Sequence, residues 1–591
     1  MEALIGAALP AIRWLHLAAL LSGLGTEAFR LLSRRPLTTT PKGERLLHRL
    51  VSWSRFSVIL ALASGAVWYW LQGSAMLGRP LDGMGAASAV AGTRFGETLL
   101  LRAGLLVLAL ALLRGEGRAR AAGLLPLAIA AWLQGFLGHG AATDSWTTAA
   151  LGLHVVAAGI WLGALPSLFA VCLLHPAHAS TLARRFTPLG LTCVIVLAAT
   201  SILQVQTLIG GLPGLLGTAY GRLALAKLAL FGALLLVACA NRFRFVPSAE
   251  TSDSVRGLAL SIAVETGLGL AIVAVAAALA SEPPAIHEPP IWPFALRPVP
   301  ALWDDTYLRN GLVRLLGPAV AALVLFILAL WLRRQRWPAL LTAAVTLAFI
   351  QVPPWRPYVV AAVPTSFQSS PTGYGARSID IGRQSFQRDC ANCHGVDARG
   401  RGPVAVAQSV WPPDLSAPLI AGRPGGELFW SIRHGIGSMP AAAQLDDAAI
   451  WSLIDFIRLR AAARIFSPSE MGWSGAARMP GFVARCTDGA IVTPGNGRPL
   501  SVWIGRDGHG ANAHVQADGA TERCVVEDAG PLAEALAEAA SSPSPPALVL
   551  VDANGWLRRV FRVEGDAASD AVASELAIIR GRPLDGASLH H

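Results

Sequence analysis

Long apolar runs in the first 355 residues constrain the fold of this chain more than any other feature. Ten of them can cross a bilayer as helices, because about 20 apolar residues span its hydrocarbon core. They occupy residues 6–29, 56–77, 97–113, 121–142, 148–174, 188–210, 222–240, 257–280, 311–332 and 338–354. The chain is 53% hydrophobic and only 14% charged, which excludes an ordinary soluble protein. The sequence therefore predicts a mainly α fold built on a polytopic bundle of about ten transmembrane helices.

The basic residues gather in alternate loops between these runs, at 30–55 and around Arg114, Arg184, Arg242 and Arg333. The intervening loops, such as 143–147, carry almost none. Basic loops stay in the cytoplasm, so both termini are expected in the periplasm of a bacterium, with the bundle in its inner membrane. The net charge of +11 is then mostly loop arginine. It indicates a lipid bilayer as partner and not a nucleic acid.

The second informative feature is the run Cys390-Ala391-Asn392-Cys393-His394. CxxCH attaches a c-type haem, because two thiols at this spacing reach the two vinyl groups and the histidine lies under the iron. Zinc or a redox disulfide would fit CxxC alone, but the histidine that follows favours haem. We predict one covalent haem c with His394 as the proximal iron ligand. Attachment of c-type haem occurs in the periplasm, which agrees with the predicted topology.

A loop methionine is the expected second iron ligand. Met439 lies in Ser438-Met439-Pro440 between two helical stretches, where it can close over the far face of the haem. Met/His ligation raises the reduction potential. The alternatives are His434, five residues earlier, and Met479, which also precedes a proline but lies beyond the end of the domain.

Residues 378–465 resemble a class I monohaem cytochrome c. The segment opens with a helix that carries Phe386, continues through CHGVDARGRGP and PPDL, and ends on an amphipathic helix at 446–463. The resemblance implies an all-α domain that transfers single electrons. With both axial positions filled, no open site remains for a substrate, so electron transfer is more in keeping with this domain than catalysis.

The first eight runs contain an internal repeat. Residues 14–19 are echoed at 152–157, and residues 95–102 are echoed at 220–227. Each copy has four helices, and an even number makes the two copies parallel.

The repeat draws attention to ionisable groups inside the membrane, which usually mark function. They are the histidines His16, His139 and His154 and the cations Arg102 and Lys227. Each histidine either makes an interhelical hydrogen bond or binds copper or a b-type haem. The cations argue against a simple cation pore, and they suit haem propionates, lipid headgroups or pairing with Glu97 and Glu265.

The stretches 153–168, 218–245 and 264–284 resemble the copper resistance protein D family over about residues 1–285. The family is associated with copper handling across the bacterial inner membrane. The resemblance implies a copper site at His16, His139 and His154. However, the chain has only six methionines and no Met-rich tract, although Cu(I) prefers such soft ligands.

The rest of the chain divides by composition. A proline-rich periplasmic loop and two further helices are expected over 286–355, and a linker over 356–377. Residues 470–591 predict a small α/β domain, with a helix at 531–540 and two strands at 546–560. It faintly resembles a thioredoxin-like fold but lacks CxxC. Its Cys486 and Cys524 can form a disulfide in the oxidising periplasm.

These observations leave three hypotheses for the whole protein. In the first, the bundle carries copper and the cytochrome sets or senses its redox state. In the second, the bundle holds a b-type haem and conducts electrons from quinone to the cytochrome. In the third, the bundle only anchors an electron shuttle. All three require a redox partner: an oxidase, a dehydrogenase or a copper protein.

Overall fold

The structure is a computed structural model of the chain, which divides into two compact units, Met1–Ile291 and Trp292–His591. It describes all residues except 1, 78–82, 138–144, 249–251, 300–304, 332–335, 349–353, 418–419, 421, 508–509, 519–522, 541–546, 563–567, 582–583 and 585–591. Within the described part, nine helices are long and apolar enough to cross a membrane. The prediction of a mainly α protein with a polytopic bundle is therefore confirmed. The tenth predicted run contains only the shorter apolar helix α15 (Arg336–Ala348), and residues 349–353 after it are not described.

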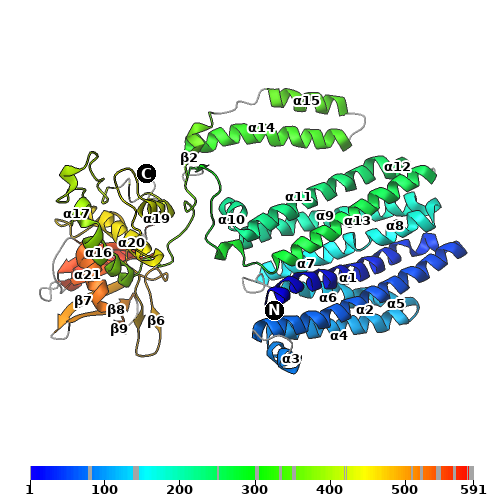
Figure 1. Ribbon diagram of the computed structural model, residues 1–591, viewed down its shortest axis with the longest axis horizontal. Helices are drawn as coiled ribbons and strands as arrows, with labels where there is room; N and C mark the ends of the chain where they lie inside the picture. Colours follow the sequence, from blue (N-terminus) through cyan, green and yellow to red (C-terminus); the bar gives the residue numbers. More distant parts are fainter. Residues whose placement is uncertain are drawn as a thin grey trace. The chain divides into compact units, whose positions relative to one another are not determined.

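The first unit is a bundle whose long helices lie side by side along a common direction (Figure 1). Its helices are α1 (Glu2–Leu37), α2 (Pro41–Leu77), α3 (Gly83–Ala91), α4 (Arg94–Arg114), α5 (Gly117–Ala122), α6 (Leu124–Trp132), α7 (Ser145–Leu162), α8 (Leu165–Leu174), α9 (Ala179–Leu208), α10 (Leu212–Gly217), α11 (Ala219–Ala240), α12 (Val246–Ser248) and α13 (Ser252–Leu279). Many apolar side chains on the bundle surface are exposed, as Leu101, Ile202 and Leu236 are. A soluble protein would not leave such a surface in water, whereas a bilayer covers it.

Two helices of the bundle begin in the same way. The side chain of Thr93 accepts a hydrogen bond from the Gly96 amide at 3.1 Å, and Thr218 accepts one from Gly221 at 2.9 Å. These caps satisfy amide groups that the first turn of a helix leaves without partners. They open α4 and α11, the helices that carry the echoed stretches 95–102 and 220–227.

Glycines bring α1 close to the junction of α7 and α8. A Cβ atom on Gly25 would lie 2.2 Å from the Gly163 carbonyl carbon, and one on Gly163 would lie 1.9 Å from the Leu21 oxygen. Only residues without a side chain permit such an approach. Small residues at helix crossings are the usual means of tight packing in a membrane.

The second unit contains a strand pair, a helical hairpin, a haem-motif region and a large sheet. The helical parts are α14 (Thr306–Trp331) with α15, then α16 (Ala376–Asp389), α17 (Ala391–His394), α19 (Gly425–His434) and α20 (Asp447–Ala463). Strands β1 (Leu296–Pro298) and β2 (Val359–Ala361) pair antiparallel. Helices α16 and α20 cross at Gly382, where a Cβ would lie 2.0 Å from the Ser452 oxygen. Next to this crossing the Phe386 and Phe456 rings pack with centroids 5.2 Å apart.

The C-terminal sheet has nine described strands in the order β3-β4-β11-β10-β7-β8-β9-β5-β6. They are β3 (Phe466–Ser467), β4 (Gly472–Arg478), β5 (Ala484–Arg485), β6 (Ile491–Val492), β7 (Leu500–Asp507), β8 (Gly510–Ala517), β9 (Cys524–Val526), β10 (Ala547–Val551) and β11 (Trp556–Arg562). Each of these strand pairings is antiparallel. The faint likeness to a thioredoxin-like fold is therefore wrong in topology, because that fold is built on a parallel βαβ unit.

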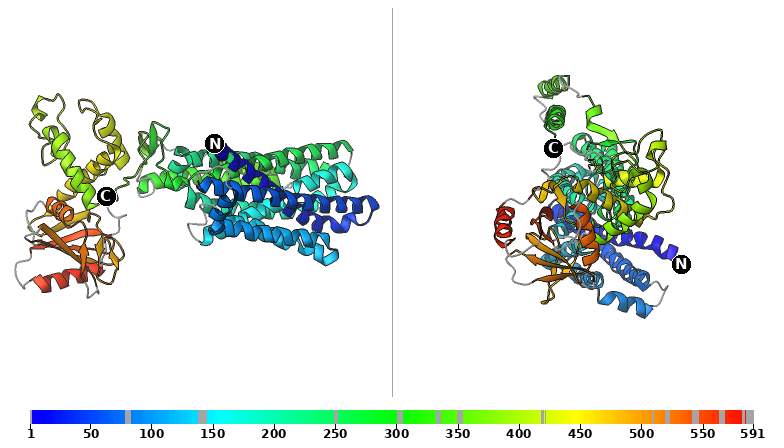
Figure 2. Two further views of the ribbon diagram at one scale, coloured as in Figure 1. Left: turned by 60° about the horizontal axis from the view of Figure 1, so that its bottom comes forward. Right: turned by 90° about the vertical axis from the view of Figure 1, so that its left-hand side faces the viewer.

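Strand β10 explains the long apolar run of residues 547–551. Val549 and Val551 belong to the core that includes α21 (Ala529–Ala539), whereas Leu548 and Leu550 pack with α22 (Ala568–Gly581). Successive side chains of a strand point to opposite faces, so a strand covered on both faces is apolar throughout. The two helices lie on opposite faces of the sheet in Figure 2. The predicted helix and both predicted strands are present.

Helix α21 also packs against the haem-motif helices. Leu532 and Leu536 contribute to the sheet core, while Ala535 and Ala539 contribute to the core of α16, α19 and α20. An ion pair joins Arg460 on α20 to Glu538 on α21. The backbones are also joined, because the Ala376 amide donates to the Gly481 oxygen at 2.8 Å. The haem-motif region and the sheet are therefore packed as one body.

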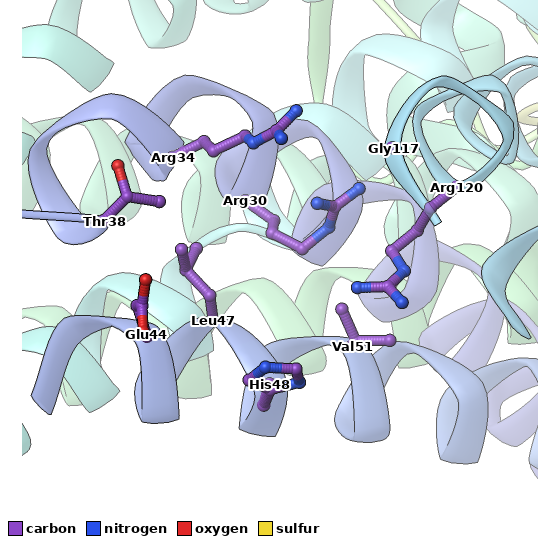
Figure 3. A pocket seen from close by; sticks show the side chains of 9 residues that line it. All are labelled: Arg30, Arg34, Thr38, Glu44, Leu47, His48, Val51, Gly117 and Arg120. Atoms are coloured by element: carbon purple, nitrogen blue, oxygen red, sulfur yellow. The ribbon is translucent and has the colours of Figure 1, made fainter. Parts of the chain in front are cut away.

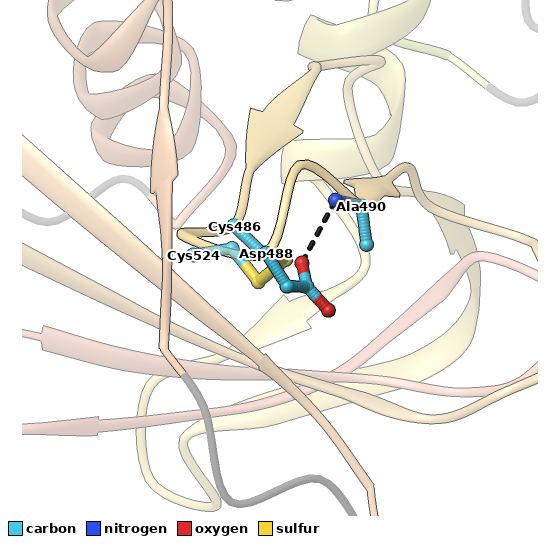
Figure 4. The surroundings of a disulfide bond; sticks show 4 residues. All are labelled: Cys486, Asp488, Ala490 and Cys524. Atoms are coloured by element: carbon cyan, nitrogen blue, oxygen red, sulfur yellow. Dashed lines mark hydrogen bonds between the residues drawn. A yellow bond between two sulfur atoms is a disulfide. The ribbon is translucent and has the colours of Figure 1, made fainter.

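A disulfide links Cys486 to Cys524, with an S–S distance of 2.01 Å and a Cα–Cα distance of 4.1 Å. It ties the end of β5 to the start of β9, beside a turn in which Asp488 accepts a hydrogen bond from the Ala490 amide (Figure 4). This is the pairing expected from the sequence.

Candidate haem and membrane sites

The CxxCH motif forms a single helical turn directly after α16. The amides of Cys393 and His394 donate to the Cys390 oxygen at 3.1 and 2.9 Å, and Gly395 ends the turn with a φ of 77°. Such a turn places Cys390 and Cys393 on one side, as attachment to one haem requires. Both thiols are free and half-buried. Burial, with the neighbouring Asp389 carboxylate and Cys393 thiol, raises the pKa of Cys390 to about 12.

His394 is held in the orientation and tautomer that a haem ligand needs. Its Nδ1 lies 3.3 Å from the Pro413 carbonyl oxygen. The oxygen can only accept, so Nδ1 carries the proton and Nε2 keeps its lone pair for a metal. Burial also lowers the pKa of His394, which favours the neutral, metal-binding form. The residues therefore fit a c-type haem.

The loop that carries Pro413 is pinned to the segment after the motif. The Leu415 amide donates to the Ala398 oxygen at 2.8 Å. Gly400 has a φ of +75°, and a Cβ there would lie 2.1 Å from the Pro412 oxygen. Glycine at position 400 thus allows the loop to reach the position from which Pro413 orients His394.

Met439 lies in a tight turn between α19 and α20. Its backbone exchanges two hydrogen bonds with Ile436, at 2.9 and 3.1 Å. Gly435 permits the turn with a φ of +77°, since a Cβ there would lie 2.4 Å from the Met439 oxygen. The Met439 side chain packs against the same apolar core as Cys390.

The two alternative ligands have other surroundings. His434 is exposed, contacts the Trp430 oxygen through Nδ1 at 3.1 Å, and stacks on the Trp430 ring with centroids 3.7 Å apart. Met479 is only 3% exposed and belongs to the core of the sheet. Of the three candidates, Met439 is the one that shares a core with the haem motif.

In the membrane bundle, both ring nitrogens of His16 are engaged. Its Nδ1 lies 2.8 Å from the Ala61 carbonyl oxygen, and its Nε2 lies 3.2 Å from Nη1 of Arg102. The carbonyl accepts and the guanidinium donates, so the neutral Nδ1–H tautomer satisfies both contacts. Both residues are buried, at 1% and 0% exposure. A metal at His16 would have to displace Arg102.

His154 makes the corresponding contacts differently. Its Nδ1 lies 2.9 Å from the Thr200 hydroxyl, whose own proton is directed at the Val196 oxygen at 2.7 Å. The histidine must therefore donate through Nδ1, which leaves the Nε2 lone pair available. His16 thus contacts a cation directly, through Arg102. The expected counterpart in the second half of the bundle, Lys227, lies on α11.

The predicted copper site at His16, His139 and His154 stays a prediction, because one of its three ligands is not described. That ligand, His139, lies outside the described residues. Among the described residues no group of three or more His, Cys, Asp or Glu side chains is close enough to hold a metal ion. One soft donor, Met76, lines a cavity of about 270 Å³. Trp68 lines the same cavity, and its ring centroid lies 5.5 Å from that of His16.

The hydrogen-bond partners of these histidines were not predicted from the sequence. Pro413 was noted only as part of a motif, and nothing in the sequence links Ala61 or Thr200 to the histidines. Their partners lie 45 and 46 residues away along the chain. One signal for the cations was available in the sequence. The echo of residues 95–102 at 220–227 puts Arg102 and Lys227 at matching positions.

Three family descriptions match segments of the chain. Residues 1–150 match the copper resistance protein D-like N-terminal domain, and residues 180–279 match copper resistance protein D. Residues 377–457 match cytochrome c oxidase, cbb3-type, subunit III.

Two curated proteins are similar to part of the chain. Copper resistance protein D of Pseudomonas syringae pv. tomato is 30% identical over 179 residues, 27% of this chain and 56% of that protein. Copper transport protein CutJ of Bacillus subtilis (strain 168) is 32% identical over 157 residues, 25% of this chain and 28% of that protein. The chain thus spans about half or less of these relatives. No solved structure matches.

These matches agree with the geometry of both units. The CxxCH turn and its oriented histidine lie in the segment that matches a cytochrome c, which implies haem c. The apolar helices lie in the segments that match copper resistance protein D, so this is a multi-pass membrane protein. The chain therefore joins a copper resistance protein D-like membrane region to a cytochrome c domain.

Proposed function

We propose that this protein is a c-type cytochrome of the bacterial inner membrane, which transfers single electrons at the periplasmic face and handles copper through its bundle. Cys390 and Cys393 hold the haem covalently, and His394 and Met439 hold its iron. The observation that carries this proposal is the contact of His394 Nδ1 with the Pro413 oxygen, because it reserves Nε2 for iron. The haem, when bound, supplies an iron that cycles between two oxidation states.

The surrounding residues support electron transfer over substrate chemistry. Met439 comes from a tight turn and packs on the apolar core that Cys390 also contacts, which supports it as the second axial ligand. A filled position excludes a substrate from the iron. The partner is then a redox protein that docks near the haem. It is an oxidase, a dehydrogenase or a copper protein.

The haem assignment is tested on the purified full chain. We expect one covalent haem c per chain, which is lost from Cys390→Ala and Cys393→Ala. Met439→Ala should keep the haem, lower its reduction potential by on the order of a tenth of a volt or more, and open the iron to added cyanide. Met479→Leu is the matched control, since this side chain is buried in the sheet core, and it should change neither property. An unchanged potential in Met439→Ala would refute Met439 as the axial ligand.

Copper handling by the bundle is proposed from its relatives, whose names are copper resistance and copper transport proteins. His154 is the side chain best suited to meet the metal, because its Nε2 lone pair is available whereas that of His16 is not. On this view His16 and Arg102 form a structural pair, and copper binds at His154. His139 is a second candidate ligand for the same copper ion.

Copper content of the full chain tests this part. His154→Ala should lower bound copper at least tenfold, the loss of a principal ligand. The exposed His48→Ala is the control and should bind copper as the wild type does. Copper bound equally by both variants would refute the site. A b-type haem band in the reduced-minus-oxidised spectrum would favour the electron conduit instead.

A further inference from the structure

A basic cavity lies at the end of the bundle where α1 passes into α2 and α4 passes into α5. Its volume is about 260 Å³, and its polar lining includes Arg30, Arg34, Glu44, His48 and Arg120. Figure 3 shows Arg30 and Arg120 with their guanidinium groups directed into the space between α1, α2 and α5. The nearby loops are the arginine-rich ones that the positive-inside rule assigns to the cytoplasm.

Two of the arginines are fixed in place through one edge each. Arg30 is 6% exposed, and its Nε and Nη2 lie 2.8 and 2.7 Å from one oxygen of the buried Glu27. Arg120 donates from Nε to the Gly115 oxygen at 2.8 Å. In both side chains the hydrogen bond is made through Nε, and the buried Nη2 of Arg30 has no hydrogen-bond partner among the described residues. An arginine held by one edge is prepared to bind an oxyanion with the other.

The charges around the cavity do not cancel. Glu27 balances Arg30, and Glu44 at the exposed rim balances one further cation. The three lining arginines therefore exceed the two carboxylates by one positive charge. The imidazole of His48 is a further hydrogen-bonding group in the lining. An anion bound between the guanidinium groups of Arg30 and Arg120 lowers the electrostatic energy of this net positive lining. Ordinary loop arginines, by contrast, extend into water.

We propose that this cavity binds a phosphate group at the level of the inner-leaflet headgroups. Phosphate matches the paired guanidinium donors, which form bidentate hydrogen bonds to its oxygens. The group belongs to an anionic phospholipid or to a free phosphate in the cytoplasm. Basic pockets between helices on this side of a membrane are suited to lipid headgroups. The site is independent of copper and of the haem.

The experiment uses the full chain with its haem and two probes. In the first, the protein is reconstituted with phosphatidylcholine, with or without phosphatidylglycerol, and retained phosphatidylglycerol is counted by native mass spectrometry. In the second, inorganic phosphate is titrated onto the protein in neutral detergent, and the unfolding temperature is followed. Retention of phosphatidylglycerol identifies the lipid as the source, and stabilisation by phosphate alone identifies the free anion.

Arg120→Gln should weaken binding of whichever probe binds by about tenfold or more, because one charge-assisted contact is lost. Arg34→Gln, at the exposed rim, should weaken it without disturbing the fold. Arg118→Gln is the matched control, because Arg118 lies on the same short helix but does not line the cavity. Binding of neither probe, or an equal loss in Arg118→Gln, would overturn the proposal.

Discussion

Hydrogen-bond partners decide what each histidine of this protein can do. Imidazole has one donor and one acceptor when neutral, so a partner on one nitrogen fixes the role of the other. In His394 and His154 the Nδ1 proton is used and Nε2 is available. In His16 both are used. Identical residue types thus divide into two histidines with an available lone pair and one whose ring nitrogens both have partners.

A buried carboxylate provides a prediction of pH dependence. Asp455 on α20 is 1% exposed and accepts hydrogen bonds from Thr372 and from Ser378, the latter at 2.7 Å. Burial raises its pKa, and the two hydrogen bonds and the charge of Arg458 oppose that rise only in part. The half-buried Tyr374 is close enough to feel this charge, and its pKa is raised by burial and by Asp455.

A raised pKa means that the folded chain holds this proton more tightly than the unfolded chain. The contribution of Asp455 to stability is therefore fully present below the unfolded pKa of about 3.9, and it is lost as pH rises through the folded pKa. We expect Asp455→Asn to lack this loss, so that it gains stability relative to the wild type over the same pH range. Chemical denaturation, followed by haem absorbance at several pH values, measures the difference. Asp447→Asn, an exposed position, is the control, and parallel curves for Asp455→Asn and wild type would contradict the prediction.

At the scale of elements, close backbone contacts fix how helices cross. Gly382 lets α16 approach α20 so closely that a Cβ would lie 2.0 Å from the Ser452 oxygen. The obstacle is backbone, which cannot turn aside as a flexible side chain can. The crossing also positions Phe386 against Phe456, and α16 leads directly into the CxxCH turn.

Gly382→Ala should therefore force the two helices apart and destabilise the domain by about 1–3 kcal/mol, as overpacking does. Gly530→Ala on α21 is the matched control. It meets nothing within 4 Å, so it should be neutral or slightly stabilising through helix propensity. The midpoint of denaturation, read from the haem absorbance, gives both values. Equal midpoints for the two variants would show that the crossing tolerates a side chain.

Elements were more predictable than the contacts between them. The apolar runs, the CxxCH motif and the strands around 547–562 are local signals, because their periodicity lies within a few residues. The pairing of His16 with Arg102 is not, since 86 residues separate them. The sheet topology also depends on distant pairings such as β10 with β7, and the thioredoxin likeness failed there. The basic cavity likewise needs residues of α1, α2 and α5 to be brought together.

At the scale of the molecule, the sheet and the haem-motif helices are one packed body. Helix α21 supplies Leu532 and Leu536 to one core and Ala535 and Ala539 to the other. The two cores should unfold in one transition, because neither is complete without this helix. This organisation gives the C-terminal residues a structural role in the cytochrome.

Ala539→Leu tests the shared helix, because Ala539 is 0% exposed at the junction. Overpacking should lower the stability of both cores by the same amount, about 1–3 kcal/mol. Haem absorbance reports on one core, and hydrogen exchange of the β10 peptide reports on the other. Two separate transitions, or a shift confined to the haem signal, would mean that the sheet folds independently.

The position of α21 in the chain also sets an order in time. A ribosome makes the Cys390–His394 turn well before it makes residues 529–539, and domains fold as they emerge. The thiols are therefore available to a maturation enzyme while the helix that completes their core is still missing. We therefore expect haem attachment to precede closure of the core, so that α21 packs over a cofactor that is already in place.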